Sequence, residues 1–294
     1  MSILSMTGFG RGEAQGKQVK ITLEISTVNR KQFDCNVAFP RECACLESAF
    51  QKLIHQRVTR GYVKGVLTIQ PIAGSDGEIA LDLQTLQKQV KAVRAAARFL
   101  DIPDTLSASD LFRFPDLFHP KFMPDDPASL WPEIKEATDR ALDQLTEMRT
   151  REGANLADDL RSRLDALKGI AAEIRALSRE VPGNYRIALE KRLADLMGQG
   201  SAVDPELLAQ EVAIFADRAD ISEEMTRIES HFDQAEKILA EGGACGRTLD
   251  FLCQEFFREI NTTGSKANNT EISTRVIAFK AGLEAIREQV QNIE

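Results

Sequence analysis

The sequence lacks the features that mark several common protein classes. No run of about 18 apolar residues occurs among its 294 residues, so we expect no membrane-spanning helix. The opening stretch MSILSMTGFGRGE has neither the basic nor the long apolar segment of a signal peptide, which predicts a cytoplasmic protein. There is no GxSxG, no GxGxxG after a strand, and GSK at 264–266 lacks the upstream glycine of a phosphate-binding loop.

Cysteine is scarce and odd in number, which argues against a disulfide framework. The five cysteines stand in a chain long enough to fold without bridges, as is usual in a reducing compartment. Cys43 and Cys45 are separated by one residue, and no second pair completes a four-thiolate zinc site. We expect all five to be free thiols.

What the chain does contain is typical of a soluble globular protein, with 43% apolar and 28% charged residues. Its net charge of −8 is unevenly spread. Residues 1–72 hold ten Lys and Arg against five acids, a surplus of +5, which leaves −13 on the rest of the chain. This asymmetry indicates one end that attracts polyanions and another that repels them or uses acids to hold cations.

The residue patterns predict an α+β fold, with a small N-terminal α/β-sandwich-like unit followed by a long, mostly helical region. Alternating apolar residues indicate half-buried strands, and apolar residues at spacings of three and four indicate a helix between them. The expected strands are 3–11, 18–27, 32–39 and 61–72, and the expected helix is 42–58.

From about residue 79 onward helical patterns dominate. We expect helices at 81–100, at 109–114, from Trp131 to about 177, and on to about 197 after a break at 181–183, with a proline-rich linker at 114–127. A new helix should start with Asp204 as N-cap and Pro205 as its first residue. Three parts follow: a basic domain at 1–78, with an extension to about 125 as the alternative, a helical linker and oligomerisation region at 79–203, and a C-terminal helical domain at 204–294.

Two helices near the C-terminus have unusual polar sides. Around the first, Ile214, Ile221, Met225, Ile228 and Phe232 share one apolar arc. A second stripe follows the same spacing beside that arc and consists of Asp217, Asp220, Glu224, Arg227 and His231. Charged residues beside an apolar stripe are ordinary on a surface helix, and a solvated face is the simplest explanation.

The next helix, within 249–269, has the same character, which weakens that explanation. Helices joined by a short glycine-rich turn pack antiparallel, so the two polar strips are expected to face one cleft. Oxygen ligands with one imidazole favour Mg²⁺ or Mn²⁺, ions that activate water for attack at phosphorus. One wall would carry Asp220, Glu224 and His231, and the other Asp250, Glu255 and Glu259. Of the other two histidines, His55 lies beside Arg57 and is expected at the surface or facing RNA, and His119 has no neighbouring ligand pattern.

Motifs along the whole chain resemble the YicC family. They are SMTGFGR (5–11), EISTVNRKQFD (24–34), RGYVKG (60–65), REGANL (151–156), DISEEMTRIESH (220–231), GRTLDFLCQEFFREINTTGSKA (246–267) and REQVQNIE (287–294). The resemblance implies a divalent-metal-dependent endoribonuclease, a hydrolase of single-stranded RNA linked to small-RNA turnover. It also implies a homo-oligomer, a hexamer in that family, and other RNA-decay proteins as partners.

The same resemblance implies roles for particular residues. The metal set would be Glu223, Glu224, His231, Asp250, Glu255 and Glu259, and the catalytic residues would be Glu224, His231, Glu255 and Glu259. RNA contacts would come from Arg11, Asn29, Arg30, Arg60 and Lys64. The sequence departs from the family where Ser26 and Thr27 precede Val28, since the family often has Arg or Lys there.

The resemblance and the charge pattern together lead to a mechanism in which the basic domain grips the RNA backbone and the acidic helical domain holds Mn²⁺ or Mg²⁺. Arg258 and Lys266 lie among the acids and are expected to contact phosphate. Aromatic residues in the basic part are few, and most of Phe9, Phe33, Phe39 and Tyr62 suit strand cores. The alternative is an RNA-binding adaptor without catalysis, which delivers small RNA to another nuclease. A helical scaffold is a third possibility.

Overall fold

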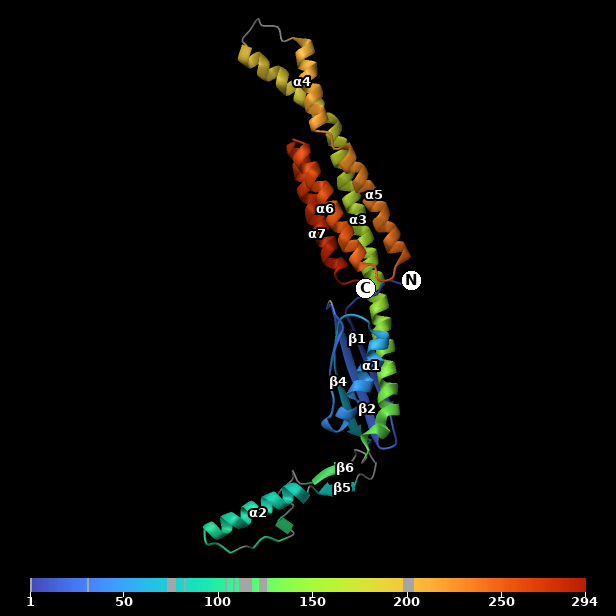
Figure 1. Cartoon of the computed structure of the whole chain (residues 1–294), viewed down its shortest axis with the longest axis vertical. Coiled ribbons are helices and arrows are strands. Elements are labelled where there is room, and N and C mark those ends of the chain that lie inside the picture. The colour runs from blue at the N-terminus through green and yellow to red at the C-terminus, as the bar shows by residue number, and fades with distance from the viewer. Residues whose placement is uncertain are drawn as a thin grey trace. The chain divides into compact units, whose positions relative to one another are not determined.

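The computed structural model of the chain describes residues 2–30, 32–72, 78–81, 83–103, 105–107, 109–110, 118–121, 126–197 and 204–294. The chain forms two compact units, one of residues 9–146 and one of residues 147–294 together with residues 1–8. Figure 1 shows the elements of each unit. Helix α3 (Trp131–Met197) contributes to both units. The division expected from sequence at residues 78 and 203 stays a prediction.

A four-stranded sheet lies at the centre of the first unit and confirms the α+β class. The strands are β1 (Gly8–Gln15), β2 (Val19–Val28), β3 (Asp34–Ala38) and β4 (Tyr62–Pro71), in the order β1-β2-β4-β3. Strand β2 runs antiparallel to β4, with Val28 opposite Tyr62, and β3 runs parallel to β4. The alternation in β2 predicted this strand correctly, because every second side chain from Val19 to Thr27 is buried.

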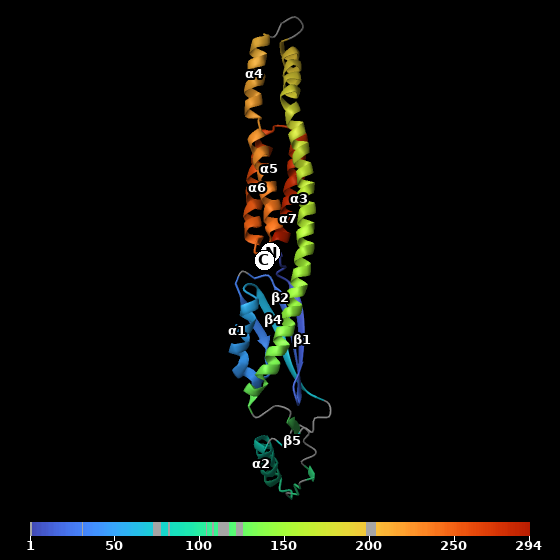
Figure 2. The same ribbon diagram turned by 90° about the vertical axis from the view of Figure 1, so that its right-hand side faces the viewer.

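One face of the sheet is covered and the other is open. The inward side chains of β2 and β4 share a core with Phe50 of α1 (Glu47–Arg57) and Ile134 of α3. Figure 2 shows α1 and the first turns of α3 beside the sheet. A 3-10 helix (Arg41–Leu46) precedes α1, so the helix expected at 42–58 begins later than predicted.

The first expected strand also starts later, at Gly8 rather than Ile3. The residues before it join the helical unit, where Leu4 and Glu294 exchange backbone hydrogen bonds and Met6 donates to Asn292. Pairing with the end of the chain therefore takes the place of the predicted pairing inside the sheet.

Two further strands and a helix lie between β4 and α3. Strands β5 (Glu78–Leu81) and β6 (Phe118–Lys121) form an antiparallel pair, and α2 (Leu83–Phe99) follows β5. Helix α2 confirms the helix expected at 81–100. The prediction of a plain linker at 114–127 is wrong at Phe118–Lys121, where backbone pairing to β5 stabilises a strand despite Pro120. Most of the helix expected at 109–114 lies outside the described residues.

The second unit is helical. Its elements are the later part of α3, α4 (Pro205–Arg218), α5 (Ser222–Glu241), α6 (Gly246–Lys266) and α7 (Thr270–Val290). Helix α6 packs against both α5 and α7. Helix α4 begins as expected, with the Asp204 carboxylate accepting a hydrogen bond from the Glu206 N–H and Pro205 in the first turn. No helix in the described part of the chain is long and apolar enough to cross a membrane.

Two sequence expectations for these helices are wrong. Helix α3 continues through Pro182 without a break, because Val181 is buried in the core of this unit and its packing outweighs the lost backbone hydrogen bond. The helix expected to carry one stripe from Asp217 to His231 is instead interrupted at residues 219–221. There the Asp220 carboxylate accepts hydrogen bonds from the Ser222 backbone N–H and hydroxyl, which stabilise a turn just before α5.

Candidate functional site

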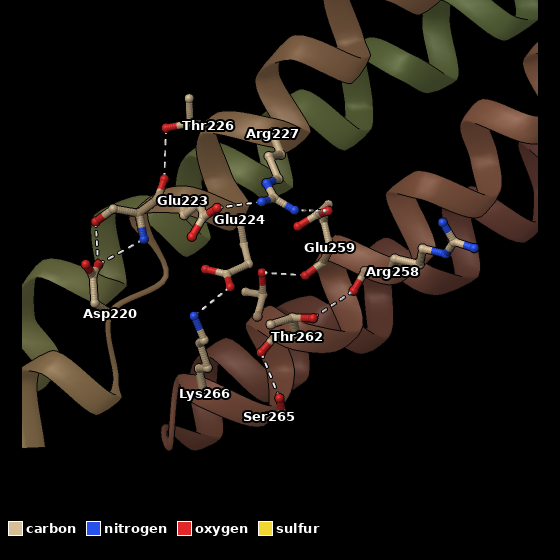
Figure 3. Close-up of polar contacts among 12 residues, drawn as sticks. Asp220, Glu223, Glu224, Thr226, Arg227, Arg258, Glu259, Thr262, Ser265 and Lys266 are labelled. Atoms are coloured by element: carbon tan, nitrogen blue, oxygen red, sulfur yellow. Dashed lines mark hydrogen bonds and ion pairs between the residues drawn. The ribbon is translucent and has the colours of Figure 1, made fainter.

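The candidate site is a polar strip along the contact between α5 and α6, shown in Figure 3. The helices are joined by a turn in which Gly242 and Gly243 have positive φ angles of 66° and 80°, a conformation that glycine adopts without strain. Apolar residues of both helices share one core. Beside that core, residues early in α5 meet residues late in α6, as an antiparallel pair requires.

Glu224 is the most enclosed acid of the strip. Only 5% of the residue is exposed, and its Oε1 lies 2.7 Å from Nζ of Lys266. Its second oxygen, Oε2, is buried and has no hydrogen-bond partner among the described residues. The hydrogen bond to Glu224 raises the pKa of the Lys266 amine. Glu224 is therefore a buried carboxylate with only one oxygen satisfied, an arrangement that costs free energy.

Glu259 is the second buried acid and is 8% exposed. Arg227 lies between two carboxylates, with Nη2 2.5 Å from Oε1 of Glu223 and Nη1 3.4 Å from Oε1 of Glu259. The hydrogen bonds that the Arg227 guanidinium donates, first to Glu223 and then to Glu259, raise the pKa of Arg227. The hydroxyl of the fully buried Thr263 donates to the Glu259 backbone oxygen at 2.9 Å.

His231 lies on the same strip, beyond Arg227 on α5. Its ring meets Phe256 edge to face, with centroids 5.5 Å apart. Its Nδ1 atom is buried and has no hydrogen-bond partner in the described part of the chain. Glu224 and His231 therefore lie on α5, and further contacts of the strip reach α6 through Arg227 to Glu259 and through the His231 ring to Phe256. Their role as the walls of one site stays a prediction.

Asp220, Glu255 and Asp250 take other partners. Asp220 lies in the turn before α5, and the hydrogen bonds from Ser222 lower the pKa of its carboxyl. Glu255 lies 2.6 Å from Nη1 of Arg258 on its own helix.

Asp250 is nine residues from Glu259, or about 13 Å along the helix axis. Its carboxylate accepts a hydrogen bond from Nε of Arg287 on α7 at 3.0 Å. Asp250, Glu255 and Glu259 were expected to form one wall of the site. They are instead spread along α6, and Asp250 pairs with Arg287 of α7.

Comparison with known proteins adds to this geometry. Residues 3–158 match the model of the endoribonuclease YicC-like N-terminal region, and residues 174–294 match that of the endoribonuclease YicC-like C-terminal region. The chain belongs to the YicC-like family. A family member from Clostridioides difficile, named probable endoribonuclease YicC, is 36% identical over 291 residues and covers 99% of both chains. Another of that name, from Haemophilus influenzae, is 30% identical over 295 residues, covering 99% of this chain and all of its own.

The acids of this YicC-like chain include candidate ligands for a divalent metal ion. Among the described residues no group of three or more His, Cys, Asp or Glu side chains is placed to hold one. Mg²⁺, however, commonly keeps several waters and binds one or two carboxylates together with substrate phosphate. The unpartnered oxygen of Glu224 and the nearby Glu259 are donors of that kind. A pair of carboxylates is thus the donor set that a hydrated ion would use, and in this structure Lys266 and Arg227 balance the charge of the two glutamates.

The residues that the family resemblance assigns to RNA lie in and beside the sheet of the other unit. Arg11 pairs with Glu13 and Glu24, at 2.7 and 3.2 Å. The Arg30 guanidinium lies over the Tyr62 ring, 5.3 Å from its centroid.

Arg30 also pairs with Asp34, and Asn29 directly precedes it after the end of β2. Nε of Arg60 is buried without a partner in the described chain. Lys64 is exposed on β4. Arg11 and Lys64 thus lie on strands of one sheet, and Asn29, Arg30 and Arg60 lie next to the ends of its strands.

Some functional candidates escaped the sequence reasoning. Arg227 received no role, although its spacing of four from Glu223 indicated an ion pair. No pattern in the sequence indicated that Arg287 would hold Asp250, because the pair joins different helices. Phe9 and Tyr62 were assigned mostly to strand cores, yet Phe9 is 44% exposed.

Proposed function

We propose that this YicC-like protein is an endoribonuclease that hydrolyses phosphodiester bonds of single-stranded RNA, with the strip between α5 and α6 as its cutting site. The observation that carries this proposal is Glu224, a buried carboxylate with an unpartnered oxygen beside a second buried glutamate. The names of the two relatives support the reaction class. Small-RNA turnover and a hexameric assembly belong to the proposal through the family resemblance alone.

A divalent cation, Mn²⁺ or Mg²⁺, is part of the proposal, and Glu224 and Glu259 are the residues that would hold it. When bound, such an ion neutralises charge on the scissile phosphate and lowers the pKa of its water. Arg227 and Lys266 provide positive charge beside these acids, and their N–H groups donate to phosphate oxygens. The Nδ1 atom of His231, which has no hydrogen-bond partner among the described residues, is suited to accept or deliver a proton.

Glu255 has a supporting role in this scheme. It is held by Arg258, whose side chain is 70% exposed and therefore accessible to an RNA phosphate. Neutralising Glu255 would release Arg258 from its partner, so we expect a weaker effect on cleavage than at Glu224 or Glu259. Glu223 is exposed and is expected to act only by positioning Arg227.

The experiment compares Glu224→Gln and Glu259→Gln with wild type on an internally labelled single-stranded RNA, with Mn²⁺, Mg²⁺ or EDTA. Each variant should lower the cleavage rate by about a hundredfold or more, because charge stabilisation in the transition state is lost. Glu288→Gln on α7 is the matched control, since this glutamate is exposed and lies outside the strip. Cleavage that persists in both variants refutes the assignment, and RNA binding without cleavage by wild type favours the adaptor.

A further inference from the structure

The open face of the four-stranded sheet carries side chains that the cutting site does not use. On β1, β2 and β4 the residues alternate with buried ones, so they all point away from α1 and α3. Phe9 of β1 is 44% exposed and Val66 of β4 is 51% exposed. Together with Tyr62 and Lys64 they line a hollow of about 450 Å³. We define these four residues and their neighbours Ser26 and Asn36 as the open face.

The strand register places hydrogen-bonding groups around Lys64. In the pairing of β2 with β4, Ser26 is opposite Lys64, and in the pairing of β3 with β4, Asn36 is opposite Lys64. Side chains opposite each other on neighbouring strands lie about 5 Å apart. An ammonium, an amide and a hydroxyl therefore form a row across three strands, between the ring of Tyr62 and the side chain of Val66. Such a row combines groups for a phosphate with groups for the edge of a base.

The charges around the open face favour a polyanion. Lys64 takes part in none of the ion pairs among the residues that the structure describes. Glu24, the acid in the hollow, is held by Arg11 at 3.2 Å, so its charge is already balanced. Residues 1–72 as a whole carry ten Lys and Arg against five acids. A peptide with an apolar face would leave this surplus of positive charge unmatched.

We propose that the open face binds a segment of single-stranded RNA, with bases stacked on Phe9 and Tyr62 and backbone phosphate held by Lys64 and Arg30. This inference rests on the proposed function, because RNA is taken as the substrate. Stacking requires a base that is free of a duplex, so the site selects single strands. The Arg30 guanidinium over Tyr62 extends the stacked surface, as arginine planes do in RNA complexes.

The test measures binding in EDTA, with a fluorescein-labelled 12-nucleotide oligouridylate and an abasic oligomer of the same length. Phe9→Leu keeps apolar volume but removes the ring, and it should weaken binding of the oligouridylate by roughly tenfold. Its binding of the abasic oligomer should stay at the wild-type level. Tyr62→Ala should behave alike and Tyr62→Phe should bind as wild type. Phe99→Ala on α2 is the control, because that phenylalanine is 89% exposed outside the sheet.

Lys64→Ala separates the phosphate contact from stacking. It should weaken binding of both oligomers and reduce the slope of log Kd against log salt concentration by about 0.7. Wild-type affinity of Phe9→Leu and Tyr62→Ala for the oligouridylate would overturn the proposal. If wild type shows ring-dependent binding but no cleavage, the proposed nuclease function is refuted and the proposed binding site on the open face is supported. Each result thus bears on one of the two proposals.

Discussion

Replacing Gly12 with alanine is expected to destabilise the sheet unit, because the backbone of α3 lies directly against this residue. A β-carbon built at position 12 comes within 1.9 Å of the Ala137 carbonyl oxygen and 2.6 Å of the Ala141 amide nitrogen. Real β-carbons stay beyond 3.0 Å, so β1 and α3 must move apart by roughly 1 Å. Overpacking costs about 1–3 kcal/mol, and we expect the upper value because the obstacle is backbone rather than a flexible side chain.

The assay is thermal unfolding followed by circular dichroism and calorimetry. A loss of about 3 kcal/mol should lower the Tm of the sheet unit by about 10 °C. Gly169→Ala provides a control of opposite sign, since this helical glycine of α3 has no atom within 4 Å of its built β-carbon. It should stabilise the protein by about 0.5–1 kcal/mol. A Gly12→Ala variant that melts with wild type would refute the close contact between β1 and α3.

Three further outcomes follow from the described residues. Cys45 is exposed, so it should be the thiol that reacts quickly with Ellman's reagent, whereas the buried thiols should react only after unfolding. Asp250→Asn should retain cleavage within about twofold, because the carboxylate pairs with Arg287 outside the strip, and a larger loss would return Asp250 to the site. The hydrogen bonds from Ser222 lower the pKa of Asp220 in the folded state. The ionised Asp220 carboxylate therefore stabilises the fold above its ordinary pKa, and this stabilisation is lost as pH falls through the lowered pKa of the folded state. Acid unfolding of Asp220→Asn, compared with wild type, should show this difference.

The strands of the sheet were predictable because local pattern and tertiary environment agree. In β2 each buried residue faces the helices and each alternate residue faces solvent, so the period of two is visible in the sequence. The continuous helix through Pro182 was not predictable, since the burial of Val181 depends on residues distant in the chain. The break at Asp220 left a weak local sign, because an aspartate side chain that bonds the backbone two residues on favours a turn over a continuous helix.

The candidate site was predictable to the extent that it follows helical spacing. Glu224 and His231 on α5, and Glu259 on α6, were assigned to facing walls from spacing and the short turn between the helices. What spacing does not give is the partner of each charge. Arg227 bridges two carboxylates and Arg287 removes Asp250 from the group, and both facts depend on side-chain placement.

The burial of Glu224 and Glu259 is hard to explain by stability. Removing a carboxylate from water costs several kcal/mol, and an apolar pair of similar volume is often as stable as a buried ion pair or more stable. Glu224 also leaves one oxygen without a hydrogen bond, and an unsatisfied buried group costs about 1–3 kcal/mol more. The side chains of Lys266 and Arg227, the cations that balance the two acids, are themselves 39% and 57% exposed, so an incoming phosphate can reach them. Features that lower stability while keeping charge at a solvent-accessible edge are characteristic of sites maintained for chemistry.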